Sequence, residues 1–232
     1  MKNFLISFLL YLITISDSVS QNGWIQQSSG TSNHLNKVFF INSSTGWISG
    51  DNGIILNTVN GGINWHRQIT NTSKNLLAIS FKDKDTGWAA GGIGDNNPLC
   101  QDLVLILKTT NGGVNWISNQ SGYGNTYQDI AVTDNCVYLS SYGIDFSCMS
   151  VSGSILKSTN SGSVWEFLDL QIPSGFKSIY FLNTNTGWAA GFWSTDVPPT
   201  IFRIFKTTNA GLNWLITFAD STPTFGGYYF RP

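Results

Sequence analysis

One eight-residue motif recurs four times along this chain of 232 residues, and its spacing constrains the fold more than any other feature. Each copy starts with Ser or Thr and places Asn two, Gly four and Trp seven residues later. The closing tryptophans are separated by 51, 49 and 49 residues. Repeats of this length are typical of solenoids and propellers. The four copies comprise Thr58, Asn60, Gly62 and Trp65; Thr109, Asn111, Gly113 and Trp116; Ser158, Asn160, Gly162 and Trp165; and Thr207, Asn209, Gly211 and Trp214.

Each repeat contains four short segments that we expect to be strands. An alternating run ends sixteen residues after Trp24 and after each motif Trp, and a second segment is centred seven residues further on. The third segment precedes the motif and the fourth carries its Trp. No stretch longer than ten residues has a helical period. The repeat therefore predicts an all-β fold, a β-propeller of four-stranded antiparallel blades. The runs end at Phe40, Phe81, Val132, Phe181 and Phe230, and the second segments are centred on Trp47, Trp88, Leu139 and Trp188.

The repeats define one β-propeller domain over residues 21–232. Complete units are expected at about 35–66, 76–117, 127–166 and 176–215. Partial strands at 24–28 and 225–230 would be the fourth and first strands of a further blade whose middle strands are missing. The chain is therefore expected to be a fragment of a larger propeller, or else a four-bladed or open arc with exposed strand edges.

Residues 1–20 are predicted to be a signal peptide. Lys2 precedes an apolar run from Phe4 to Ile15, and Ser18-Val19-Ser20 supplies the small residues of a cleavage site. The run is shorter than the roughly 20 residues of a membrane-spanning helix. An uncleaved membrane anchor is the alternative. The mature protein is therefore expected to be secreted, at the cell surface or periplasmic.

The charge of the chain argues against a nucleic-acid partner. Only 11% of the residues are charged and the net charge is -1, whereas a nucleic-acid binder needs surplus cations to neutralise phosphates.

The motif itself is expected to be structural. Its Asn side chain fixes a turn, its Gly supplies positive φ, and its Trp buries a large apolar face. Lys108, Lys157 and Lys206 recur at one repeat position and are expected to line solvent as a row.

The motif resembles the Asp-box (BNR) repeat, with Asn in place of Asp in all four copies. The Thr-Gly-Trp-x-x-Gly elements and the segment Leu-Lys-Thr-Thr-Asn-Gly-Gly are similar to those of the photosystem II stability/assembly factor propellers. The resemblance covers residues 24–230 and implies a scaffold that binds assembly partners; photosynthesis enters by resemblance only. Factors of that family are expected to bind through an Arg-rich patch, whereas the mature chain has only Arg67, Arg203 and Arg231.

Sialidases resemble this repeat as well, and they need three clustered arginines, a Tyr–Glu pair and an acidic Asp. The three arginines here are scattered, and the sole Glu, Glu166, follows a motif Trp. We therefore expect no catalytic residue and no enzyme activity. No cofactor is expected, and no metal site, because His34 and His66 are far from the three cysteines in sequence.

A candidate binding face lies on the loops between the second and third strands. Three neighbouring repeats lengthen this loop by 8–10 residues, at 91–103, 143–153 and 191–200. Extended loops on a rigid scaffold are common sites of function. An acidic rim with aromatics would suit a sugar, a basic peptide or a cation; the alternative is that the loops have drifted and bind nothing. The residues are Asp95, Asp102, Asp145, Phe146, Phe192, Trp193 and Asp196.

Two of the three cysteines lie in these lengthened loops. Cys100 and Cys148 lie in adjacent loops on this face, so a disulfide between them is the preferred pairing in an oxidising compartment. Cys136 lies in a turn on the opposite face, and it would pair with Cys148 only through local distortion.

Two functions follow as hypotheses. The first is a non-catalytic secreted or periplasmic propeller that binds protein partners. The second is a carbohydrate-binding or adhesion module that uses Trp193 and Phe146 to bind an extracellular glycan.

Overall fold

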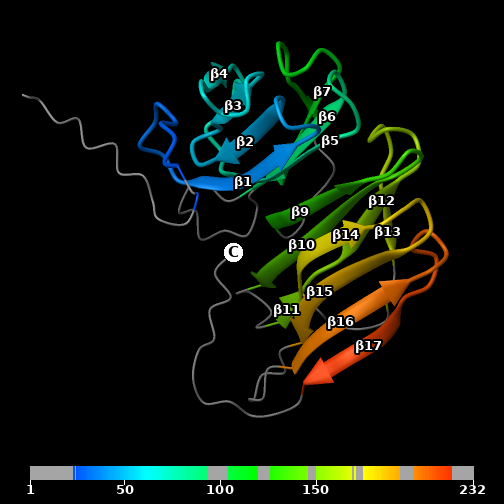
Figure 1. The fold of residues 1–232 in the computed structure, drawn as a ribbon. Coiled ribbons are helices and arrows are strands. Elements are labelled where there is room, and N and C mark those ends of the chain that lie inside the picture. Colours follow the sequence, from blue (N-terminus) through cyan, green and yellow to red (C-terminus); the bar gives the residue numbers. More distant parts are fainter. Residues whose placement is uncertain are drawn as a thin grey trace, which may run out of the picture.

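The computed structural model describes residues 23, 25–92, 104–119, 126–145, 150–168, 170, 175–193 and 201–220. These residues form strands joined by turns, without a helix, which confirms the all-β prediction (Figure 1). No helix in these ranges is long and apolar enough to cross a membrane.

Four antiparallel sheets follow one another along the chain, and we number them blades 1 to 4. Blade 1 contains β1 (Leu35–Phe40), β2 (Gly46–Gly50), β3 (Ile55–Thr58) and β4 (His66–Gln68). Blade 2 contains β5 (Leu76–Phe81), β6 (Gly87–Gly91), β7 (Leu105–Thr109) and β8 (Ile117–Asn119). Blade 3 contains β9 (Thr126–Val132), β10 (Val137–Asp145), β11 (Ser150–Ser152), β12 (Ile155–Ser158) and β13 (Glu166–Leu168). Blade 4 contains β14 (Gly175–Phe181), β15 (Gly187–Trp193), β16 (Ile201–Thr207) and β17 (Leu215–Asp220).

Three details differ from the sequence prediction. Each fourth strand begins one residue after the motif Trp, because that Trp still belongs to the turn. In blade 3, β10 extends into the expected loop and pairs with the additional strand β11. Residues 25–28 form no strand, since the structure describes no third strand beside them; Trp24 lies outside the described residues.

A fourth difference concerns register in blade 3. Spacing along the sequence placed Leu139 at the position of Trp47 and Trp188. The turn between β9 and β10 is one residue shorter than its counterparts, so Tyr138 pairs with Ala131 where Trp188 pairs with Tyr180. Tyr138 is therefore the structural counterpart of the two tryptophans.

Consecutive blades pack through their inner strands. The inner strand β5 lies against β1 and β2, β9 lies against β5 and β6, and β14 lies against β9 and β10. Antiparallel pairing puts the loops between second and third strands at the same end as the starts of the inner strands. We call this the loop end, and the opposite end, with the motif turns, the turn end.

Aromatic triads fill two of the interfaces between blades. Trp47 of blade 1 stacks on Phe81 of blade 2 with ring centroids 3.6 Å apart, and Trp116 meets Phe81 edge-on. Tyr138 of blade 3 likewise stacks on Phe181 of blade 4 at 4.0 Å, with Trp214 edge-on. Burial of such large rings makes the interfaces a major source of stability.

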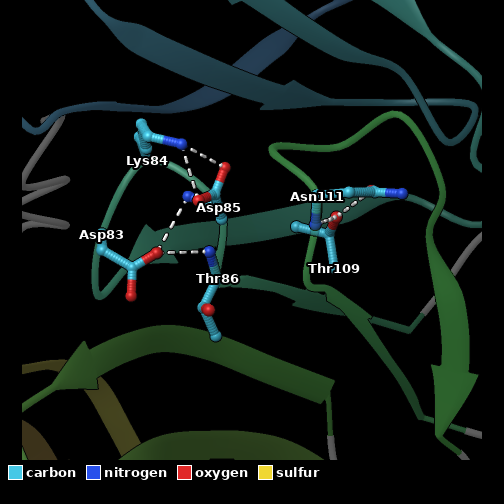
Figure 2. A network of polar contacts seen from close by, with 6 residues as sticks. All are labelled: Asp83, Lys84, Asp85, Thr86, Thr109 and Asn111. Atoms are coloured by element: carbon cyan, nitrogen blue, oxygen red, sulfur yellow. Dashed lines mark hydrogen bonds and ion pairs between the residues drawn. The ribbon is translucent and has the colours of Figure 1, made fainter.

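The motif turn is closed by its own side chains in the same way in all four copies. In blade 1 the Thr58 hydroxyl donates to Asn60 Oδ1 at 2.9 Å and accepts from the backbone N–H of Gly62 at 2.9 Å. Asn60 Oδ1 also accepts the backbone N–H of Asn64 at 3.0 Å. Figure 2 shows the Thr109–Asn111 contact of blade 2 beside the turn that joins β5 to β6.

Side chains of each blade also bind the motif turn of the next one. Trp47 Nε1 and Gln68 Nε2 both donate to the Gly112 carbonyl of blade 2. Lys108 Nζ donates to the Ser161 carbonyl of blade 3 at 2.7 Å, and Lys157 Nζ donates to the Ala210 carbonyl of blade 4 at 2.8 Å. The expectation of a solvent-facing lysine row was therefore wrong for Lys108 and Lys157, which join neighbouring blades, whereas Lys206 lies over Trp188 of its own blade.

Candidate functional site

Most of the predicted binding face falls outside the described residues. Asp95, Asp102, Phe146 and Asp196 lie there, as do Cys100 and Cys148. Asp145 and Trp193 end β10 and β15, and the structure describes their backbone only. Phe192, one residue before the end of β15, is half-buried and described in full.

A β-bulge distorts each inner strand near the loop end. In blade 1, Leu35 pairs with Gly50 and Lys37 with Ser49, so Asn36 is an extra residue. The same shift makes Leu77, Gln128 and Lys177 the extra residues of β5, β9 and β14. Bulges re-aim side chains and are common beside functional sites.

The residues after the bulges join three blades through one carboxylate. Asp129 of β9 is 4% exposed, and Lys37 Nζ of blade 1 lies 2.9 Å from its Oδ1. Its Oδ2 accepts the Ser178 hydroxyl at 2.9 Å and the Ile179 backbone N–H at 3.2 Å from blade 4. Ala78 of blade 2 occupies the matching position and, with only a methyl group, leaves room for this contact. The network is structural, since both carboxylate oxygens are already engaged.

Beside this network, Lys177 lies among polar and aromatic groups of blades 3 and 4. Its Nζ is 4.1 Å from the centroid of the Tyr142 ring and 3.2 Å from Gln128 Oε1. The Tyr142 and Phe192 rings are 4.9 Å apart, and Phe192 is 6.4 Å from Phe202. We call Gln128, Tyr142, Lys177, Phe192 and Phe202 the loop-end cluster.

The electrostatics of the loop-end cluster come from partial burial. Desolvation lowers the pKa of Lys177 and raises the pKa of Tyr142. The ion pairs among the described residues are Lys37–Asp129 and Lys84–Asp85, so no described carboxylate neutralises Lys177. An ammonium group with three donors is thus set beside two half-buried rings, an arrangement able to bind a carbonyl or carboxylate and to pack an apolar group.

The described residues offer little else for chemistry. Within them, no three His, Cys, Asp or Glu side chains lie close enough together to hold a metal ion. Glu166 is exposed on the outer strand β13. Cys136 is a buried free thiol in the turn before β10, where it packs in the core between blades 3 and 4.

Sequence reasoning overlooked Gln128, Tyr142, Lys177 and Phe202. A usable signal was present, because two successive polar residues interrupt the alternation of three inner strands. They are Asn36-Lys37, Gln128-Asp129 and Lys177-Ser178. Such a pair inside a short strand indicates a bulge.

Comparison with known proteins agrees with the β-propeller fold. Residues 16–121 match the family model described as Photosynthesis system II assembly factor YCF48. No curated protein sequence matches the chain.

Three solved structures share the fold at low identity. An ancestral GH74 enzyme has a TM-score of 0.60 and 20% identity, over 82% of this chain and 26% of its own. The GH74 enzyme of Niastella koreensis has a TM-score of 0.55 and 16% identity, over 75% and 28%. YCF48 from Cyanidioschyzon merolae has a TM-score of 0.53 and 14% identity, over 83% and 61%. The chain thus spans between 26% and 61% of the length of these proteins, and the likeness concerns the propeller fold alone.

Proposed function

We propose that this chain, a β-propeller with the BNR-type repeats of the photosystem II assembly factor-like family, is a scaffold that binds a protein partner at its loop end. The observation that carries the proposal is the position of Lys177. Its exposed ammonium group lies against the Tyr142 ring, donates to Gln128 Oε1 and has no carboxylate partner among the described residues. A partner's carbonyl or carboxylate would accept one of the N–H groups that Gln128 leaves free.

The aromatic part of the loop-end cluster suits a protein ligand. Tyr and Phe rings are frequent at the centres of protein interfaces because they bury much area at little entropic cost. Phe202 is 38% exposed at the start of β16, beside the half-buried Phe192. An apolar side chain of a partner would cover both rings while Lys177 held the neighbouring backbone.

We further propose that the chain is not an enzyme. Glycosidases need two carboxylates on opposite sides of the scissile bond. Among the described carboxylates, Asp129 is held by Lys37, Ser178 and Ile179, and Asp83 closes a turn at the opposite end. The predicted signal peptide supports a periplasmic, secreted or cell-surface location for the scaffold.

Carbohydrate binding is the second candidate, and the same rings favour it. The Tyr142, Phe192 and Phe202 rings form a connected aromatic surface onto which a sugar ring would stack. Lys177 would then donate to sugar hydroxyls.

Peptide and glycan arrays probed with the mature chain separate the two candidates. A protein scaffold is expected to select peptides and to lose them in Lys177→Ala and Phe192→Ala. The matched control is Lys84→Ala, which removes an exposed lysine at the turn end. Selection of glycans with no peptide signal would overturn the proposal in favour of carbohydrate binding.

A further inference from the structure

The outer face of blade 4 is exposed where the same face of the other blades is buried. Ile204 of β16 pairs with Ala190 and is 39% exposed. Its counterparts Ile55, Ile106 and Ile155 also pair with small residues, and each is at most 1% exposed. Blade 4 thus presents half of an interface between blades.

The interfaces between blades 1 to 4 show what packs on such a face. In each, the inner strand of the next blade lies on the first two strands of the blade before it. The residue that ends this inner strand is Phe81 or Phe181 in two of them, and it stacks on Trp47 or Tyr138.

Trp188 is the residue of blade 4 that corresponds to Trp47 and Tyr138. It is half-buried, and its ring stacks on Tyr180 of its own blade with the ring centroids 6.4 Å apart. Tyr180 itself is 59% exposed. Lys206 Nζ lies 5.4 Å from the centroid of the Trp188 ring, as Lys108 Nζ lies over Trp88. Within the described residues, no ring of a following strand stacks on Trp188.

We propose that residues 225–230 dock on this face as a fifth inner strand, with the Phe230 ring stacked on Trp188. Phe81 and Phe181 each lie sixteen residues after a motif Trp, and Phe230 lies sixteen residues after Trp214. The inner strands of blades 2 to 4 begin ten or eleven residues after the preceding motif Trp, and the same interval from Trp214 leads to residues 224–225. The segment therefore has both the length and the aromatic residue that this face requires.

A second copy of the chain fits the face less well. Blade 1 of the second copy would have to pack on blade 4 of the first copy, in the way that blade 2 packs on blade 1 within one chain. At blade 1, however, Gln27 Nε2 already donates to the Gly61 carbonyl at 3.2 Å, as Gln68 Nε2 of blade 1 donates to Gly112 of blade 2. Residues near Gln27 thus occupy the place of a preceding outer strand, and a second copy would have to displace them.

Hydrogen–deuterium exchange of the full-length mature chain tests the docking. Amides of 225–230 are expected to exchange at least about tenfold more slowly than in a free peptide of the same sequence. Trp188→Ala and Phe230→Ala are each expected to abolish this protection. Phe230→Ala leaves every described side chain intact, so it remains informative if Trp188→Ala unfolds blade 4. The matched control is Leu182→Ala, an exposed apolar residue of the β14–β15 turn, which is expected to change nothing at 225–230.

Two results would overturn the docking. One is the absence of the expected protection effect: amides of 225–230 exchange as fast in the unaltered chain as in the free peptide, or are protected equally in Trp188→Ala and Phe230→Ala. The other is protection that rises with protein concentration together with a dimer by light scattering, which would assign the face to a second copy. Phe192 and Phe202 of the loop-end cluster lie on this same face of blade 4, in register with Trp188 and Ile204. Peptide binding is therefore measured in both the unaltered chain and Phe230→Ala, which keeps a failure of the docking distinguishable from a failure of the proposed function.

Discussion

At the motif turns, two successive residues adopt the left-handed backbone conformation in every blade. Gly fills the second position throughout, but the first is Gly61, Gly112, Ser161 and Ala210 in blades 1 to 4, with φ between 55° and 70°. A residue with a Cβ is strained there, and glycine is not. The sequence predicts the turn from its Asn and second Gly. The strain at Ser161 and Ala210 can be recognised only from their backbone φ angles in the structure.

Ser161→Gly and Ala210→Gly are therefore expected to stabilise the protein by about 0.5–1 kcal/mol each. The Ser161 and Ala210 carbonyls accept from Lys108 and Lys157, and the Ala210 N–H donates to the Asn185 carbonyl. These are backbone atoms, so the glycine variants keep all three bonds. Urea unfolding measures the change. Ser163→Gly, in the same turn without positive φ, is the control and should not stabilise. Equal or lower stability of both glycine variants would refute the strain argument.

A second residue-scale prediction concerns Asp83, which closes the β5–β6 turn (Figure 2). Its Oδ1 accepts the backbone N–H groups of Thr86 at 2.7 Å and Asp85 at 2.9 Å, and the bond from Thr86 is the main reason why the pKa of Asp83 falls below its usual 3.8. A depressed carboxyl pKa adds stability that is present above about pH 4–5 and lost as the pH falls through the folded value. Asn42 and Asn183 make the same two bonds in blades 1 and 4.

Asp83→Asn should therefore keep the turn while removing this pH dependence. The stability difference between the two proteins is expected to be constant from pH 7 to 5 and to shift in favour of Asn below pH 4. Urea midpoints at pH 7, 5, 4 and 3 give the comparison. A difference that stays constant over the whole range would show that the carboxylate contributes nothing through its charge.

Among the elements, the motif turn and the bulged inner strand differ in how far the sequence reveals them. The turn is local, and its Thr, Asn and Gly are close in sequence, so its role was predictable. The backbone carbonyls of the turns also accept hydrogen bonds from Trp47, Lys108 and Lys157. These donors lie 53 or 65 residues earlier in the chain, so only the packing of the blades reveals the bonds. The bulge was missed because an alternating pattern was expected to continue unbroken.

The Asp-box motif that this repeat resembles has Asp where this chain has Asn, and the turn geometry predicts that either residue closes the turn. Asn60 uses one side-chain oxygen as acceptor for Thr58 and Asn64. Asn60→Asp keeps this acceptor and should change the free energy of unfolding by less than about 0.5 kcal/mol, whereas Asn60→Ala should cost about 1–2 kcal/mol. The control is Asn64→Ala, because Asn64 contributes only its backbone N–H. Equal losses for Asn60→Asp and Asn60→Ala would contradict the acceptor role.

For the whole molecule, the repeat spacing predicted the four blades, because each repeat supplies one sheet. The loop-end cluster was not predictable, since Lys177, Gln128 and Tyr142 meet only through the packing of blade 4 on blade 3. Asp129 shows the same principle on a larger scale: it contacts β1 and β14, which are far from it in the sequence.

Removal of the Asp129 charge is expected to weaken the arrangement of blades 1, 3 and 4 together. Asp129→Asn should cost about 1–3 kcal/mol, because a buried ion pair is broken while Lys37 is exposed enough to regain water. Lys37→Met should cost at least as much, because it leaves the buried Asp129 charge without its cation while only Ser178 and Ile179 still donate to it. Chemical unfolding of the two single variants and the double variant gives their coupling. A coupling energy near zero would show that the ion pair does not join the blades.

Site-specific photocrosslinking in the producing cell tests most directly whether the loop end binds a protein. A photoreactive phenylalanine analogue replaces Phe202, the exposed ring of the loop-end cluster, so that Lys177 is kept; the control position is 84 at the turn end. We expect one discrete protein to be captured from position 202 and not from position 84. Equal capture from both positions, or only carbohydrate adducts at position 202, would contradict protein binding at the loop end.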